Sequence, residues 1–150
     1  MVDVSVRSDD VKNLVWAIRN HADAKAMRRE LYRGLNGATK PIRDAMVAEI
    51  PNALPRRGGL AARMQASVSS TTSAARGGVS IRFRGRGYDI RTLTSGQIRH
   101  PLFGNRLHWF AQTAGVNPDA FTGEFDEQRP AALREVTNAM EEVARKVTNI

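Results

Sequence analysis

The chain has 150 residues, of which 41% are hydrophobic, and this length suffices for one sizeable core but is cramped for two. It contains no cysteine, which excludes disulfides, thiolate nucleophiles and zinc sites with sulfur ligands, and suits assembly in a reducing cytoplasm. No stretch approaches the roughly 20 apolar residues that a membrane-spanning helix requires. We therefore expect a single domain over residues 1–150, with no membrane partner.

The net charge of +8 is unevenly distributed along the chain. Residues 51–110 hold ten basic side chains and one acidic side chain, whereas residues 1–50 carry a net charge of +2 and residues 111–150 a net charge of −3. A field of one sign predicts an anionic partner, either nucleic acid or an acidic protein surface. The alternative is that these arginines only keep the surface hydrated.

The N-terminal third predicts two helices separated by a break at residues 20–23. Residues 8–10 form a capping and dipole cluster before the first helix, and apolar residues then recur in steps of three and four along both. Because Pro41 removes an amide donor, we expect a kink or break of the long second helix between residues 37 and 41. Pro51 and Pro55 should end it. The apolar positions are Val11, Leu14, Val15 and Ile18 in the first helix and Met27, Leu31, Leu35, Ala38, Ile42, either Ala45 or Met46, and Ile50 in the second.

The spacing of apolar residues changes in the middle of the chain, from steps of three and four to alternation. Residues 67–72 are rich in Ser, Thr and Val, and after Gly78 the apolar residues Val79, Ile81 and Phe83 alternate with polar ones. This pattern predicts a β-hairpin with strands at about residues 64–72 and 78–85. Its polar face would carry Arg82 and Arg84.

Two further segments complete the expected α+β fold. The sequence "RHPLFGN" at residues 99–105 predicts an extended loop running into a turn, because Pro101 disfavours helix at His100. A C-terminal helix should begin near Pro130. The apolar residues along one side of this helix form a narrow seam. This seam would pack against the long helix or the hairpin, or alternatively against another subunit. The seam residues are Leu133, Val136, Met140, Val143, Val147 and Ile150.

The residue types that carry catalysis are not arranged for it. His100 and His108 have no carboxylate at a metal-ligand spacing, and the glycine-rich residues 77–87 lack the lysine of a phosphate loop. The acids at 124, 126 and 127 have no positioned base and are interpreted as a charge cluster at a helix start. We expect no enzymatic activity, no metal and no cofactor.

The order of these segments resembles the small neck or tail-completion proteins of long-tailed bacteriophages, especially those that infect actinobacteria. The resemblance covers most of the chain from about Val11 onward, and "GGLAAR" at 58–63 and "RHPLFGN" at 99–105 are its most specific motifs. After Gln112, relatives often have a Pro-Gly-Trp-Phe type segment. This chain has "VNPDAF" at 116–121 instead, so the resemblance assigns no role to that loop.

The resemblance implies a structural virion protein of the head-to-tail connector, assembled in the host cytoplasm. Such a protein forms a ring, with six subunits expected, between the head-completion side and the tail-terminator or tail-tube proteins, around the packaged double-stranded DNA. Contact with that DNA would be non-specific, since phosphate contacts carry no sequence information. The candidates for the DNA path or a ring contact are Arg82, Arg84 and Arg86, and those for a subunit interface are Arg99, His100, Pro101, Phe103 and Trp109.

Several alternatives remain open from sequence. The chain could be a tail terminator or a minor tail protein, and Phe103 and Trp109 could be ordinary core residues. A basic nucleic-acid-binding regulator outside the virion fits the charge but lacks a helix-turn-helix or zinc pattern. A nuclease would need clustered acids for metal ions.

Overall fold

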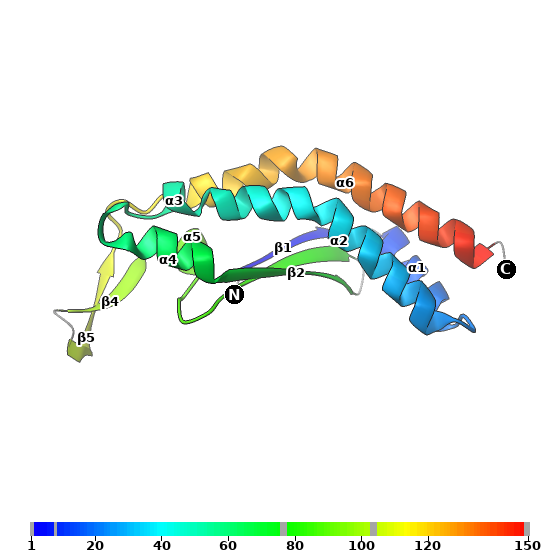
Figure 1. The fold of residues 1–150 in the computed structure, drawn as a ribbon, viewed down its shortest axis with the longest axis horizontal. Helices are drawn as coiled ribbons and strands as arrows, with labels where there is room; N and C mark the ends of the chain where they lie inside the picture. The colour runs from blue at the N-terminus through cyan, green and yellow to red at the C-terminus, as the bar shows by residue number, and fades with distance from the viewer. Residues whose placement is uncertain (1, 8, 76–77, 103–104, 149–150) are drawn as a thin grey trace. The chain divides into compact units, whose positions relative to one another are not determined.

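The computed structural model describes residues 2–7, 9–75, 78–102 and 105–148, and Figure 1 shows their fold. Helices and strands are both present, so the predicted α+β class is confirmed. The helical segments are α1 (Asp9–Arg19), α2 (Ala24–Ala48), α3 (Ile50–Ala53), the 3-10 turn η1 (Arg57–Gly59), α4 (Leu60–Ser67), α5 (Thr92–Ser95) and α6 (Pro118–Thr148). The strands are β1 (Val2–Arg7), β2 (Val68–Ala75), β3 (Gly78–Gly85), β4 (Ile98–Leu102) and β5 (Asn105–Gln112).

The strands form two sheets. One has the order β1-β3-β2, with β3 in the centre, and the other is the antiparallel pair β4-β5. Internal contacts divide the chain into two compact units, each made of separate stretches. Among the described residues, the first unit contains 2, 44–69, 83–102 and 105–127, and the second contains 3–7, 9–43, 70–75, 78–82 and 128–148.

The core of the second unit joins α1, α2 and α6 to strands β2 and β3. Figure 1 shows α6 running along α2, and a Cβ added to Gly34 would lie 3.0 Å from the Cβ of Ala139, so the two helices approach closely there. Glycine at position 34 permits this approach. The buried residues of this core are Ile18, Leu31, Leu35, Ala74, Val79, Val136, Met140 and Val143.

Two buried hydroxyl groups link α2 to β2 inside the second unit. Thr39 donates to the Leu35 carbonyl oxygen at 2.8 Å, and its Oγ1 lies 2.6 Å from the Oγ1 of Thr72. Because the Thr39 proton is used within its helix, Thr72 donates to Thr39. Both buried polar groups are thus satisfied, which avoids the cost of an unpaired hydroxyl in an apolar core.

The first unit is centred on an aromatic pair. The rings of Phe83 and Phe121 are fully buried and meet edge to face, with centroids 5.5 Å apart and an interplanar angle of 74°. The Asn117 amide donates to the Ala53 carbonyl oxygen at 2.9 Å, which holds the start of α6 to the end of α3. At the end of β3, a Cβ on Gly85 would collide with Ile90, so glycine is required there.

Several sequence predictions are confirmed. Helix α1, the break before α2 and the strand over 78–85 lie where the patterns placed them. In β3, Val79, Ile81 and Phe83 are buried in strict alternation. The seam residues Val136, Met140 and Val143 pack inside their own unit, as the intramolecular alternative proposed.

Other predictions were wrong about where elements begin or end. Helix α2 is continuous through Pro41, so no break occurs; Pro41 and Gly37 are both exposed, and solvent can reach the carbonyl that lacks a donor. Residues 64–67 belong to α4 rather than to a strand. The C-terminal helix begins at Pro118, and Pro130 lies inside it on the exposed side. The expected extended loop is the β4-β5 hairpin, and β1 was not predicted.

We predict that Phe83→Ala lowers the free energy of unfolding by roughly 3 to 5 kcal/mol, since it removes a fully buried ring and leaves a cavity beside Phe121. Arg84→Gln, at the exposed neighbouring position, is the matched control and should change stability by no more than about 0.5 kcal/mol. Denaturant unfolding of both variants provides the measurement. Equal stability of Phe83→Ala and the control would contradict the assigned core.

Candidate interaction surface

The β4-β5 hairpin of the first unit holds most of the predicted interface residues. Its antiparallel register pairs Arg99 with Ala111, His100 with Phe110, and Pro101 with Trp109. The ring centroids of His100 and Phe110 lie 5.7 Å apart across the strands. The register shifts between Pro101 and Leu102.

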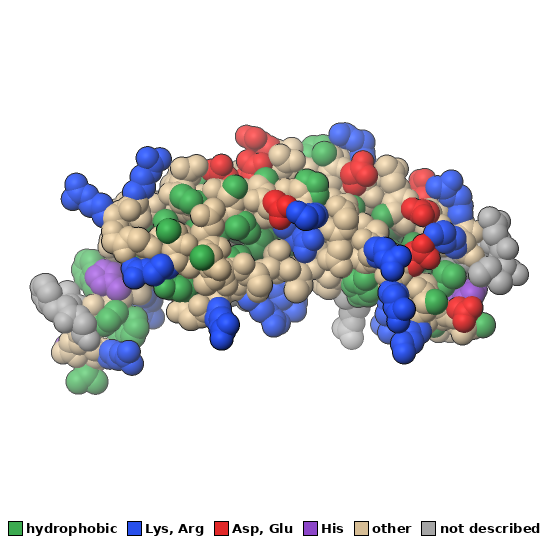
Figure 2. Space-filling view, in the orientation of Figure 1, with side chains coloured by type: hydrophobic (Ala, Val, Ile, Leu, Met, Phe, Trp, Pro, Cys, Tyr) green, Lys and Arg blue, Asp and Glu red, His purple; other side chains and the backbone are tan. Residues whose placement is uncertain are grey.

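Strand β5 is exposed along nearly its whole length, from Asn105 to Ala111. The exposed fractions of Leu107, Trp109 and Phe110 are 87%, 54% and 52%. Because successive strand residues point to opposite faces, Trp109 and Phe110 place apolar rings on both faces of the hairpin. Figure 2 shows hydrophobic side chains beside a histidine and basic side chains where Figure 1 places β4 and β5.

Local hydrogen bonds fix the shape of β5. The Trp109 indole Nε1 donates to the Arg106 carbonyl oxygen at 2.9 Å, and the Leu107 amide donates to Asn105 Oδ1 at 3.0 Å. The polar edge of the indole is therefore satisfied within the strand. The rest of the ring presents apolar surface to whatever contacts the hairpin.

An open groove of about 610 Å³ lies at the base of the hairpin. On one wall, Arg91 donates to both carboxylate oxygens of Asp89, at 2.8 and 2.7 Å, and this hydrogen bonding lowers the pKa of Asp89. On the hairpin side, Arg99 is exposed and forms no ion pair with any described residue. The groove is thus basic and aromatic on its hairpin side. Its lining residues are Asp89, Arg91, Thr92, Ser95, Gln97, Arg99 and Trp109.

The three arginines predicted for a DNA path or a ring contact differ in their surroundings. Arg84 and Arg86 are exposed at the end of β3 in the first unit. Arg82 is half-buried in the second unit and interacts with a neighbouring group. Arg84 and Arg86 are accordingly the more accessible candidates for contact with an anion.

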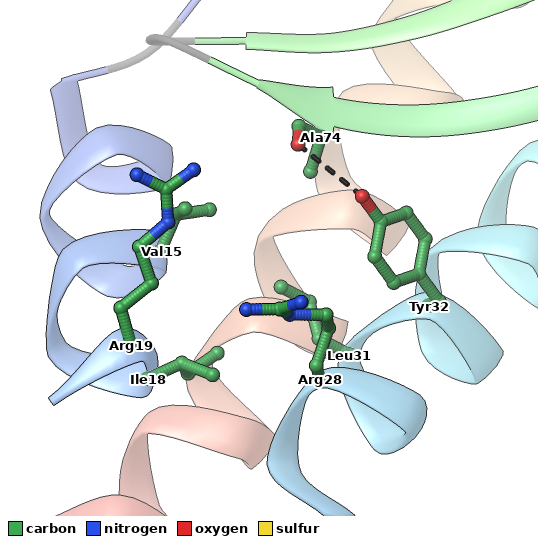
Figure 3. A pocket seen from close by; sticks show the side chains of 7 residues that line it. All are labelled: Val15, Ile18, Arg19, Arg28, Leu31, Tyr32 and Ala74. Carbon is green, nitrogen blue, oxygen red and sulfur yellow. Dashed lines mark hydrogen bonds between the residues drawn. The ribbon is translucent and has the colours of Figure 1, made fainter. Parts of the chain in front are cut away.

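The second unit has a separate small cavity of about 150 Å³, shown in Figure 3. Tyr32 donates to the Ala74 carbonyl oxygen at 3.3 Å at its edge, and Arg19 and Arg28 come from α1 and α2. Sites for small organic ligands usually exceed about 300 Å³. At about 150 Å³, this cavity is small for such a site. It is lined by Val15, Ile18, Arg19, Arg28, Leu31, Tyr32 and Ala74.

The acidic residues considered for catalysis lie within α6 rather than at its start, which corrects the interpretation as a helix-start cluster. Glu124 is half-buried, whereas Asp126 and Glu127 are exposed. Across the described ranges, no group of three or more His, Asp or Glu side chains is placed to hold a metal ion. None of the described helices is long and apolar enough to span a membrane.

The structure brings together four of the five predicted interface residues. Arg99, His100, Pro101 and Trp109 lie on the hairpin, while Phe103 falls outside the described residues. The exposure of Trp109 argues against its being an ordinary core residue of this chain. Sequence reasoning missed Leu107 and Phe110. The available signal was a run of strand-forming residues directly after the pair "GN" at residues 104–105, a pair that predicts a turn.

Comparison with protein-family models, with curated proteins and with solved structures finds no match for this chain.

We predict that Leu107→Ala changes the free energy of unfolding of the isolated chain by no more than about 0.5 kcal/mol, because Leu107 is 87% exposed. Leu93→Ala, in the fully buried position on α5 of the same unit, should cost roughly 2 to 5 kcal/mol. Thermal unfolding monitored by circular dichroism compares the two. A large loss for Leu107→Ala would show that the hairpin is covered by its own chain.

Proposed function

We propose that this chain is a structural ring protein of the head-to-tail connector of a long-tailed bacteriophage. The observation that carries this proposal is the β4-β5 hairpin, which leaves Leu107, Trp109 and Phe110 exposed among basic residues. A two-stranded hairpin is marginally stable in water, and exposed apolar side chains of this size favour a contact with another chain. The resemblance of "GGLAAR" and "RHPLFGN" to neck proteins supplies the class of assembly.

In this proposal the hairpin and the arginines of β3 have different roles. The hairpin contacts a neighbouring subunit, whereas Arg84 and Arg86 face the packaged DNA or an acidic surface of the next ring. Arginine attracts the phosphate backbone without reading bases, which is what a passage for DNA of any sequence requires. The protein then acts by assembly alone, joining the head-completion side to the tail-terminator or tail-tube proteins.

We predict that Arg84→Gln/Arg86→Gln leaves the melting temperature nearly unchanged, because both side chains are exposed, but lowers the fraction of heads joined to tails. The assay is complementation of a phage that lacks the protein. Arg82→Gln is measured separately, since its half-buried side chain is engaged and its loss carries a cost in stability. Normal joining by the Arg84/Arg86 variant would leave these arginines as surface charge only.

A further prediction concerns the purified chain, which should be monomeric or weakly associated at micromolar concentration. Its net charge of +8 opposes association between copies, because most of the excess lies in residues 51–110, where like charges repel. Analytical ultracentrifugation tests this. A salt-resistant hexamer in isolation would show that ring formation needs no partner.

Tight, base-selective and salt-sensitive binding of the monomer to short duplex DNA would support a nucleic-acid-binding regulator instead.

A further inference from the structure

The hairpin is a basic surface whose arginines form no ion pair with the described residues of its own chain. Residues 98–112 contain Arg99 and Arg106 together with two histidines, and no acidic residue. Both arginine side chains are exposed, and neither forms an ion pair with any residue that the structure describes. A partner for this surface must therefore supply both negative charge and some apolar contact.

The first turns of α6 provide a surface of that kind on the same unit. Residues 113–127 contain Asp119, Glu124, Asp126 and Glu127 and no lysine or arginine. Positions 119, 123, 126 and 127 share one helical face, because they are related by steps of three, four, seven and eight residues. Asp119, Asp126 and Glu127 are exposed and form no ion pair within the described part of the chain.

No side chain covers the centre of this acidic face. Gly123 lies between the carboxylates and has no side chain, and a Cβ built there meets nothing within 4 Å. An aromatic or aliphatic side chain of a partner can therefore reach the helix backbone between Asp119 and Asp126. The acidic face thus offers the negative charge that the hairpin lacks, around an open position that an apolar side chain of the hairpin can contact.

We propose that the β4-β5 hairpin of one copy docks on the acidic face of α6, residues 119–127, in the next copy. This inference rests on the proposed function as a ring protein and names the subunit contact of that ring. The two surfaces differ, so the contact is heterologous, and its repetition produces a closed ring or an open filament rather than a two-fold dimer. Opposite charges also fix the direction in which the copies join.

Two single-cysteine proteins test the contact, since the natural chain contains no cysteine. Leu107→Cys places a thiol at an 87% exposed position on the hairpin, and Gly123→Cys places one in open space on the acidic face without altering a charge. Because disulfide formation traps transient encounters, the test suits a weakly associating chain. Mixed and oxidised, the two proteins should give a covalent heterodimer in clear excess over the homodimer that either forms alone.

The matched control is Ala62→Cys, an exposed position on α4 of the same unit. Crosslinking of Leu107→Cys to Gly123→Cys at the level seen with Ala62→Cys would overturn the proposal. A dominant homodimer of Leu107→Cys would show a two-fold contact instead. A chain carrying both cysteines should form a ladder of oligomers, and a monomeric product with an internal disulfide would show that the two surfaces meet within one chain.

Charge reversal separates a specific contact from collision. Arg99→Glu/Arg106→Glu on the Leu107→Cys protein, or Asp126→Lys/Glu127→Lys on the Gly123→Cys protein, should each reduce the heterodimer to the control level. Combining the two reversed proteins should restore it, and failure to restore it would contradict pairing of these charges. All crosslinking arms use purified protein, and the charge-reversed chains are also tested in the phage complementation assay. A specific disulfide together with normal head-to-tail joining by the charge-reversed chains would count against the neck assignment alone. A joining defect of those chains without the disulfide would count against this contact alone.

Discussion

Strand β3 sets the constraint on which the rest of the structure depends. It is the central strand of its sheet, and its alternate residues are buried, with Val79 and Ile81 in the second unit and Phe83 in the first. A slip of one residue would expose all three and bury the arginines, so the register is strongly fixed. The same alternation sends Arg82 and Arg84 to the opposite face. Burial of one face thereby determines where positive charge is presented.

The β4-β5 hairpin is free of that constraint. No third strand pairs with it among the described residues, and β5 is exposed from Asn105 to Ala111. Its cross-strand pairs, such as His100 with Phe110, stabilise it only modestly. In the proposed ring, this segment contributes to the contact between copies rather than to the fold of a single copy. Its basic character suits the acidic surface that we propose as its partner.

The sequence allowed prediction of elements that are specified locally and missed those that depend on tertiary context. The spacing of apolar residues in α1, β3 and the C-terminal seam was sufficient to predict these elements, because each of them buries one face. Strand β1 was missed although Val2, Val4 and Val6 alternate, since a short strand needs a neighbour to form. The start of α6 was misplaced because Pro130 is tolerated inside the helix where Asp126 and Pro130 are exposed.

The exposed surface of the hairpin could be predicted from the sequence only in part. The resemblance to neck proteins, together with Pro101, Phe103 and Trp109, suggested a contact surface at residues 99–109, yet the sequence left Phe103 and Trp109 nearly as compatible with a core. Only the fold shows which aromatic side chains remain uncovered. Leu107 and Phe110 carry no signature beyond strand propensity, and their exposure depends on the absence of a covering element over β5 among the described residues.

Amide hydrogen exchange of residues 98–112 tests most directly the claim that another chain covers the hairpin in the assembly. Exposed two-stranded hairpins open easily, whereas core strands open only with global unfolding. The account predicts fast exchange over 98–112 in the dilute isolated chain and marked slowing in joined head-tail particles, with residues 79–83 slow in both. Equal exchange of 98–112 in the two states would contradict it.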